Sequence, residues 1–256
     1  MSASEASEAL RHEPFLSEFI FDFVGSQEFV KGIVRKCLWI QDADAEKAKA
    51  SAFVEARLAA VQAMRNASEA VSTQAYAEKP HRFRQIQGQS EDHSIVVPKV
   101  TSESRHYLPV GMCSAHTIVS DNAFALYDAP TWNIAVIASR LHMVWVKTVC
   151  GQLETRLRYS NTMGWNAFPV PPLTDKNKAD LTRCAEDILL AREAHFPATI
   201  ADLYDPNNMP VDLREAHERN DEVLERIYIG RRFKNDTERL EKLFELYTKM
   251  TAKVGH

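Results

Sequence analysis

The chain has 256 residues, of which 45% are hydrophobic and 26% charged, a composition typical of a globular protein with one or two domains. Its net charge of −4 indicates no particular partner, and no apolar run approaches the ~20 residues that a membrane-spanning helix needs. Four widely spaced cysteines without a CxxC pair favour buried, reduced thiols in a cytoplasmic protein over disulfides or a zinc site.

Charge is unevenly distributed along the chain. Residues 79–160 hold nine Lys and Arg against six Asp and Glu, a balance of +3. Residues 1–78 hold eight against twelve (−4), and residues 161–256 hold fourteen against seventeen (−3). The middle third is thus the net-basic part, as a surface that faces phosphate groups requires, although an uneven distribution without any ligand explains the same counts.

Two segments are expected before the net-basic part. Residues 1–22 begin with a polar, acidic stretch, which predicts a disordered leader. Residues 23–78 are expected to form a linker strand, KCLWI, and a spacer helix over 42–68 that Asp42 or Asp44 caps. The helix face predicted to pack inward carries apolar residues at helical spacing, namely Phe53, Ala56, Ala60 and Met64.

From residue 94 the apolar pattern changes to that of strands. Turn-forming residues separate the β-branched or aromatic strings SIVVPKV, SRHYLPVGM and HTIVS, and FALYDAP closes this block. A largely buried helix is expected over 131–151, ending at Gly151, followed by a strand over 152–160. Three prolines then predict an irregular loop over 161–173.

The remainder of the chain is predicted to be helical. Helices are expected at 175–195, 211–229 and 236–252, the last of them capped by Asp236. The expected fold class is therefore α+β, with a β-rich domain that follows a spacer helix and precedes an α-helical C-terminal domain.

The sequence carries no signature of a catalytic centre or a metal site. It has no glycine-rich phosphate loop, no HExxH or GxSxG motif and no paired-acid nuclease pattern. The Asn/Asp-Pro-Pro-aromatic loop with which adenine methyltransferases hold a flipped base is also missing, because Pro171-Pro172 lacks the amide before it and the aromatic after it. His116 and His142 stand apart from any Ser or Cys partner and are expected to be satisfied within the fold.

Several strings resemble a known family, the most specific being RYSNTMGWNAFPVP and LYDP…MP…L…AH. Together with GSQEFVKGIVRKCLWI, SESRHYLPVGM, APTWNIAVIASRLHMVWVKTVCG and DTERLEKLFELY, they follow the order of the C-terminal part of the MmeI-like, type IIL restriction–methyltransferases. The resemblance runs from about Phe23 to about Thr251. Proteins of this family join a nuclease, an adenine-N6 methyltransferase, a target-recognition domain and a helical C-terminal segment.

The resemblance implies a domain organisation for this chain. Residues 79–173 would be the DNA target-recognition domain and residues 174–256 the helical C-terminal domain. The methyltransferase and nuclease domains of the parent protein would be absent from this chain, together with the S-adenosylmethionine and Mg²⁺ that they use.

In this family an acidic-x-Arg pair before the RYS string reads DNA bases, and Glu154 and Arg156 match that pattern. Residues i and i+2 of a strand face the same side, so the two side chains would project together. Arginine donates two hydrogen bonds to guanine O6 and N7, and glutamate accepts one from cytosine N4, so the pair could read one base pair. The alternative is a solvated ion pair, worth ~0–1 kcal/mol.

The resemblance places further base contacts at Asn122, Ala123 and Glu103. Asparagine suits adenine N6 and N7. The alternative is that Asp121-Asn122 forms a turn between two strands, which needs no ligand.

Another set of polar and basic residues suits contacts with phosphate, which position a protein on DNA without selecting bases. A solvent-exposed charge without a partner is the alternative for any one of them, whereas as a set they support DNA binding. The set comprises Arg82, Arg84, Arg105, Lys147, Arg158, Tyr159, Ser160 and Asn161. Trp132 and Trp145 lie in the most apolar predicted helix, so core packing is expected of them rather than base stacking.

The sequence therefore predicts a module that recognises a specific double-stranded DNA sequence for a restriction–modification methyltransferase and has no catalytic residues of its own. Its expected partners are double-stranded DNA and the methyltransferase and nuclease domains of the parent, with no membrane. A helical protein-interaction or scaffold module with an incidental basic core is the alternative. The missing motifs disfavour an independent nuclease or hydrolase.

Overall fold

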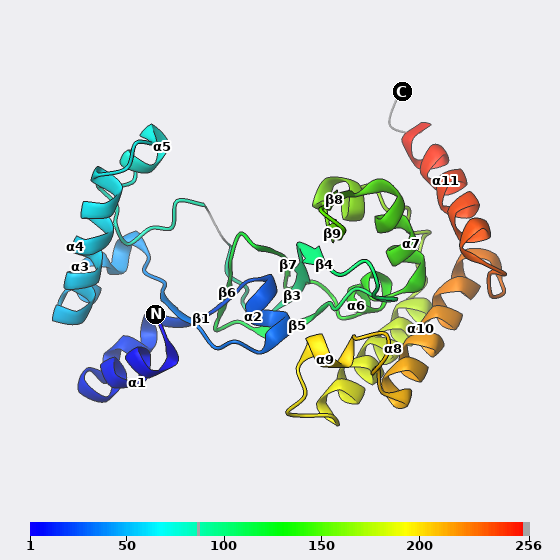
Figure 1. Ribbon diagram of the computed structural model, residues 1–256, viewed down its shortest axis with the longest axis horizontal. Coiled ribbons are helices and arrows are strands. Elements are labelled where there is room, and N and C mark those ends of the chain that lie inside the picture. The colour runs from blue at the N-terminus through cyan, green and yellow to red at the C-terminus, as the bar shows by residue number, and fades with distance from the viewer. Residues whose placement is uncertain (86–87, 253–256) are drawn as a thin grey trace.

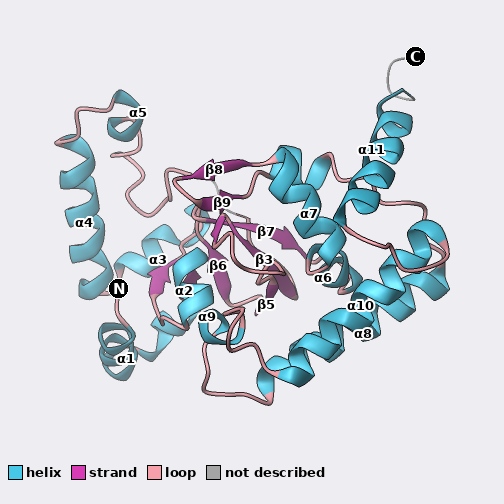
Figure 2. Ribbon diagram, turned by 45° about the vertical axis from the view of Figure 1, so that its right-hand side comes forward, coloured by secondary structure: helices cyan, strands magenta, loops and turns pink. Residues whose placement is uncertain are grey.

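The computed structural model describes residues 1–85 and 88–252 and confirms the predicted α+β fold class (Figure 1). Helices of the N-terminal third, apart from a short one at Ser26–Lys31 that lies beside the strands, are at one end of the molecule, and the long helices of the C-terminal third are at the other. Figure 2 shows the strands gathered between these two helical regions.

The first 22 residues are ordered, so the prediction of a disordered leader is wrong. They form α1 (Ala3–His12), η1 (Pro14–Glu18) and the start of β1 (Ile20–Val24). Ser2 and Glu5 make a capping box, in which Glu5 N donates to Ser2 Oγ at 3.2 Å and Ser2 N donates to Glu5 Oε2 at 2.8 Å. The polar stretch thus contains the capping residues that start a helix, and Ala6 and Ala9 of this helix are buried in a local hydrophobic core.

The predicted spacer helix is divided into shorter pieces. Its first part comprises η2 (Asp42–Asp44) and α3 (Ala45–Lys49), and Ser51 then caps a new helix, α4 (Ala52–Asn66). The buried face of α4 carries Val54, Leu58 and Arg65, whereas Ala56, Ala60 and Met64 are exposed. Of the predicted inward face, only Phe53 packs against this local core, and it is half-buried. The other three positions are wrong, because Val54 and Leu58 repeat at the same spacing and bury more apolar surface than alanines. We call residues 42–79, which include α5 (Val71–Gln74), the arm.

The strands form three small sheets in the described part of the chain, with the orders β2-β1-β6, β5-β3-β7 and β4-β9-β8. In the first sheet β1 pairs in parallel with β6, with Phe23 opposite Ile118, so the N-terminal segment is built into the β-rich region. The remaining strands are β2 (Lys36–Leu38), β3 (His93–Pro98), β4 (Val100–Thr101), β5 (Gly111–Ser114), β6 (Thr117–Val119), β7 (Ala123–Tyr127), β8 (Gly151–Leu153) and β9 (Arg156–Arg158). The strand predicted at 104–112 is extended only at its end, where β5 begins.

The long buried helix predicted over 131–151 is two helices, α6 (Trp132–Ile137) and α7 (Arg140–Val149). Ser139 separates them, because its Oγ accepts from His142 N at 3.1 Å and donates to Val136 O at 2.7 Å. After the β8–β9 hairpin, the predicted irregular loop begins with a π-helical turn, η3 (Asn161–Asn166).

The C-terminal region consists of helices. They are α8 (Asp175–Glu193), α9 (Ile200–Leu203), α10 (Val211–Ile229) and α11 (Asp236–Ala252). One further short helix, α2 (Ser26–Lys31), belongs to the N-terminal part, between β1 and β2. The predicted ranges of the last two long helices are confirmed. The cap of α11 is Asn235 rather than Asp236, because Asn235 Oδ1 accepts from Glu238 N at 3.0 Å.

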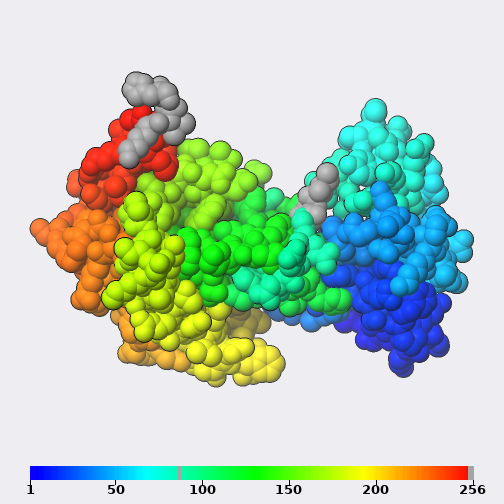
Figure 3. All heavy atoms as spheres, turned by 180° about the vertical axis from the view of Figure 1, so that it is seen from behind, coloured from blue at the N-terminus to red at the C-terminus, as the bar shows by residue number. Residues whose placement is uncertain are grey.

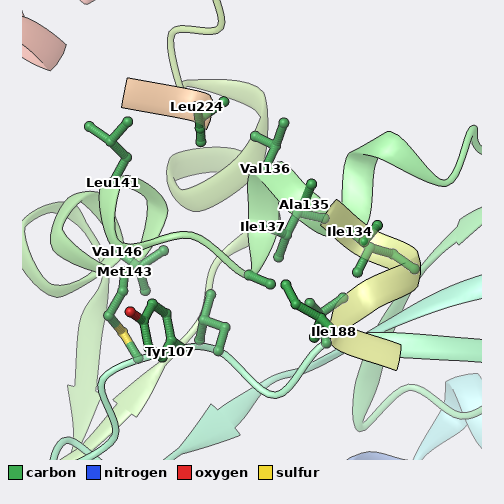
Figure 4. Close-up of a cluster of buried hydrophobic side chains, with 14 of the residues drawn as sticks. Tyr107, Ile134, Ala135, Val136, Ile137, Leu141, Met143, Val146, Ile188 and Leu224 are labelled. Atoms are coloured by element: carbon green, nitrogen blue, oxygen red, sulfur yellow. The ribbon is translucent and has the colours of Figure 1, made fainter. Parts of the chain in front are cut away.

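One hydrophobic core extends from the β-rich region into the C-terminal helices. Ile134, Val136 and Ile137 of α6 are fully buried, and they belong to the same cluster as Ile188 of α8 and Leu224 of α10 (Figure 4). Helices α6 and α10 pack on α8, and α11 packs on α7. The helices after residue 174 are therefore continuous in packing with the segment that carries the predicted DNA contacts.

Candidate nucleic-acid interface

The segment predicted as one strand over 152–160 is a hairpin, which we call the recognition hairpin (residues 151–158, β8 and β9). Glu154 and Thr155 form its turn, and Glu154 has a left-handed φ of 57°. Glu154 is thus not in a strand, and the expectation that it shares a strand face with Arg156 is wrong. The two side chains nevertheless meet at the exposed tip, where Arg156 Nη2 donates to Glu154 Oε2 at 2.8 Å, with side-chain exposures of 49% and 76%.

The strand alternation places Arg156 and Arg158 together on the outer face of the hairpin. Between and beyond them, Leu157 and Tyr159 turn inward and are 2% and 4% exposed. The register sets Arg158 opposite Gly151 of β8 and Val100 of β4. Within the described residues, no carboxylate forms an ion pair with Arg158. The outer face of the hairpin therefore offers one guanidinium paired with Glu154 and a second one available for a ligand.

Tyr159 is part of the core, contrary to its predicted contact with phosphate. Its hydroxyl lies 3.0 Å from Nε2 of the fully buried His142, and its ring packs near Phe124. Burial lowers the pKa of His142 to about 3, so this ring is neutral. Ser160 is half-buried and caps η3, accepting from Met163 N at 3.3 Å, while Asn161 is exposed beside it.

The loop that follows β4, the strand paired with β9 of the hairpin, carries Glu103 and Arg105, and Lys147 of α7 bonds to this loop. Lys147, at the end of α7, donates through Nζ to the carbonyl oxygens of Glu103 at 3.0 Å and Arg105 at 3.5 Å. Arg105 Nη1 donates to Thr101 Oγ1 at 2.9 Å, one position from the residue of β4 that pairs with Arg158. These two cations bond neutral oxygens, and neither forms an ion pair with a carboxylate within the described residues. Burial, and then the charge of Arg140, lower the pKa of Lys147.

The predicted site at Asn122 and Ala123 is divided between surface and core. Ala123 begins β7, is 5% exposed and packs with Val96 and Val119, so a base contact by its side chain is ruled out in this structure. Asn122 is exposed in the turn before β7, where its backbone N donates to Ser120 Oγ at 3.3 Å. Both expectations for Asn122, a turn residue and an exposed amide, are therefore compatible with its position.

Lys99 is a basic residue of this surface that the sequence analysis did not single out. Its Nζ donates to the carbonyl oxygen of Asp121, next to Asn122, and lies 4.6 Å from the centre of the Phe124 ring. Its own carbonyl accepts from Tyr159 N at 2.8 Å. Lys99 thereby connects the Asn122 turn with the end of β9. The sequence offered one indication of this role, because Lys99 is the single residue between β3 and β4.

Arg82 and Arg84 contact the arm, and in the described part of the chain neither forms a hydrogen bond with the recognition hairpin. Arg82 Nε donates to Asp42 Oδ1 at 2.7 Å, and the hydrogen bonds from Arg82 and then His81 lower the pKa of Asp42. Arg84 Nη1 donates to the hydroxyls of Ser72 at 3.2 Å and Thr73 at 3.3 Å. Figure 3 shows the molecular outline hollowed between the arm, in cyan, and the green part of the molecule. The predicted contact residues thus lie in two groups, one at the arm and one around the hairpin.

The described residues also bear on cofactors and membranes. Among them, no group of three or more His, Cys, Asp and Glu side chains is arranged to hold a metal ion. None of the described helices is both long enough and apolar enough to cross a bilayer.

Comparison with known proteins gives consistent matches along the whole chain. A family described as "MmeI, target recognition domain" matches residues 1–172, and a family described as "MmeI, C-terminal domain" matches residues 173–255. The first match begins at residue 1, so it includes the segments before residue 79 that the sequence analysis set apart as leader and spacer.

Two individual proteins show how much of a longer protein the chain represents. DNA methyltransferase A of Bacillus subtilis (strain 168) is 38% identical over 250 residues, which cover 98% of this chain and 28% of that protein. The solved structure of the type IIL restriction-modification enzyme MmeI in complex with DNA superposes with a TM-score of 0.90 at 31% identity, over 98% of this chain and 34% of the solved one. The chain thus spans about a third of these relatives.

Proposed function

Because the chain belongs to the MmeI family, as its target recognition domain followed by its C-terminal domain, we propose that it recognises a specific sequence in double-stranded DNA on behalf of a restriction–modification methyltransferase. The observation that carries the proposal is the recognition hairpin, whose exposed tip presents a carboxylate beside a guanidinium. An acceptor and a bidentate donor at this spacing match the edge of a G·C pair in the major groove.

The residues around the hairpin supply the second part of the proposal. Arg158, Arg105, Lys147 and Lys99 have no carboxylate partner in the described part of the chain, so they suit the phosphate oxygens that flank the bases. Arg84, which is exposed and, among the described residues, bonds only hydroxyl groups of the arm, suits a similar contact. Glu103 and Asn122 are exposed and remain our candidates for further base contacts.

Adenine-N6 methylation and DNA cleavage are proposed activities of the whole protein, with methyltransferase and nuclease domains as partners of this chain. S-adenosylmethionine and Mg²⁺ would act in those domains. The described residues include no cluster of metal ligands that would fit Mg²⁺, and the sequence has no loop of the kind that holds a flipped adenine. No step of the chemistry is therefore assigned to this chain.

Selection from a pool of short duplexes with a randomised centre tests the proposal. The 256-residue chain should enrich one short motif, and Glu154→Ala with Arg156→Ala should remove the preference at one of its positions. Binding to the pool should weaken steeply as salt rises, because phosphate contacts release counterions. Absence of any motif, together with salt-independent binding, would favour the helical protein-interaction module instead.

A further inference from the structure

The recognition hairpin makes few contacts of its own, so its pose depends on how its two ends are held. All three residues of β8 are exposed, and among the described residues outside the hairpin only the two of β4 pair with β9. The hairpin starts directly after α7 and runs into η3. Anything that fixes α7 against η3 therefore also fixes the direction in which the tip points.

Trp145 makes that connection. Its side chain projects from α7, the residue is 1% exposed, and its indole N–H donates to the carbonyl oxygen of Met163 in η3 at 2.9 Å. Gly164, the next residue of η3, makes a second close contact, with Tyr159 and Cys150. A Cβ there would lie 3.1 Å from Cζ of Tyr159 and 3.3 Å from Sγ of Cys150, the two residues that flank the hairpin. The turn η3 is thus pressed against the base of the hairpin.

The last helix of the chain closes on Trp145 from the other side. The indole ring is 5.4 Å from the ring of Phe244 and 5.7 Å from that of Tyr247, both on α11. Tilted contacts between aromatic rings at this distance are favourable beyond the burial of area. A helix nearly one hundred positions along the chain therefore fixes the rotamer of the residue that ties α7 to η3.

From this arrangement we infer that α11 sets the pose of the recognition hairpin, with Trp145 as the positioning residue that transmits it to the tip. This inference rests on the proposed function. It assigns the C-terminal domain a part in base discrimination without any contact between that domain and DNA.

The test uses the 256-residue chain and the randomised duplex pool described above. Trp145→Phe keeps an aromatic ring in the core but removes the indole donor. We expect its affinity for the pool as a whole to stay within about twofold of wild type, because the phosphate contacts are unchanged. Discrimination at the base pair read by Glu154 and Arg156 should fall about fivefold, the effect of one lost hydrogen bond on the hairpin's alignment.

Two more variants complete the test. Trp39→Phe is the matched control, because it removes an indole hydrogen bond of the same length, 2.9 Å to Gln89 Oε1, remote from the hairpin, and should retain wild-type discrimination. Phe244→Ala leaves the Trp145 N–H intact, is 42% exposed and thus tolerates truncation, and should lower discrimination at the same base pair. If Trp145→Phe does not fold, the discrimination measured with Phe244→Ala tests the inference in its place.

The possible failures are distinguishable. If the wild-type chain enriches no motif, the proposed function fails and this inference with it. If the wild type enriches a motif and Trp145→Phe or, where that variant is unfolded, Phe244→Ala keeps the full discrimination, the inference alone is overturned.

Discussion

A single residue, Gly164, allows η3 to pack closely against the two ends of the recognition hairpin. The two side chains that a Cβ would meet, those of Tyr159 and Cys150, are held in place by the surrounding core. Glycine is thus required here by a close approach, and not by a left-handed backbone, since its φ is not positive.

We therefore predict that Gly164→Ala lowers the free energy of unfolding by about 1–3 kcal/mol, the usual effect of overpacking a buried site. Gly151→Ala is the matched control, because no atom lies within 4 Å of the Cβ it would add. Urea denaturation of both variants measures the difference, and equal stabilities would contradict the packing described.

His142 allows a prediction about pH. Its ring is buried and its Nδ1 has no hydrogen-bond partner within the described residues. Because burial lowers its pKa from 6.5 to about 3, the unfolded chain binds this proton more readily than the folded chain does. The stability that the neutral ring contributes is complete above pH 6.5 and is lost as the pH falls towards 3, by up to ~1.4 kcal/mol per pH unit.

The check is the urea midpoint measured between about pH 7 and pH 4. His142→Phe cannot take up the proton, so its midpoint should fall less over this range than that of the wild-type chain. Parallel pH profiles would show that His142 does not titrate on unfolding as described.

Among the secondary-structure elements, the C-terminal helices were predictable because their apolar residues repeat at helical spacing and a residue that ends helices follows. Helix α10 ends at Gly230, which has a φ of 79°, and the predicted range 211–229 matches it. The hairpin was missed because Glu154 and Thr155 are not strong turn-forming residues, so nothing local interrupted the strand pattern. The alternation of Arg156, Leu157, Arg158 and Tyr159 was nevertheless an available signal that Tyr159 faces inward while Arg158 faces solvent.

Ser139 divides a run that hydrophobicity alone predicts as one helix. Its hydroxyl serves both helices, donating to the end of α6 and accepting from the start of α7, and the residue is fully buried. Ser139→Ala should lower the free energy of unfolding by about 1–2 kcal/mol, since it removes a cap and leaves a buried N–H unpaired.

The exposed cap Thr174 provides the control for that prediction, because Asn177 N, which donates to it at 3.1 Å, can turn to water instead. Thr174→Ala should therefore have the smaller effect in thermal or urea denaturation. A reversed order would show that the break between α6 and α7 does not depend on the Ser139 hydroxyl.

At the scale of the whole molecule, the two family matches meet in one core. Residues from α6 and α7 pack with residues from α8, α10 and α11 in a single buried cluster. The recognition core and the C-terminal helices should therefore unfold in one transition. In a Trp39→Phe background the remaining tryptophans, Trp132, Trp145 and Trp165, all lie in or against this core. Their fluorescence and the helical circular dichroism should give the same urea midpoint, and two separated transitions would contradict a shared core.

Glu154 and Arg156, side by side at the hairpin tip, are proposed to read one base pair, and the proposed function depends on them more than on any other residues. The direct measurement is the motif that the randomised duplex pool yields with Glu154→Lys combined with Arg156→Asp. Donor and acceptor are then exchanged, so the preference should change at one position only, from one orientation of G·C to the other. Arg158→Ala, the control for a phosphate contact, should weaken binding to all sequences alike. If the double exchange leaves the motif unchanged, the two residues are a surface ion pair and the base contacts lie elsewhere.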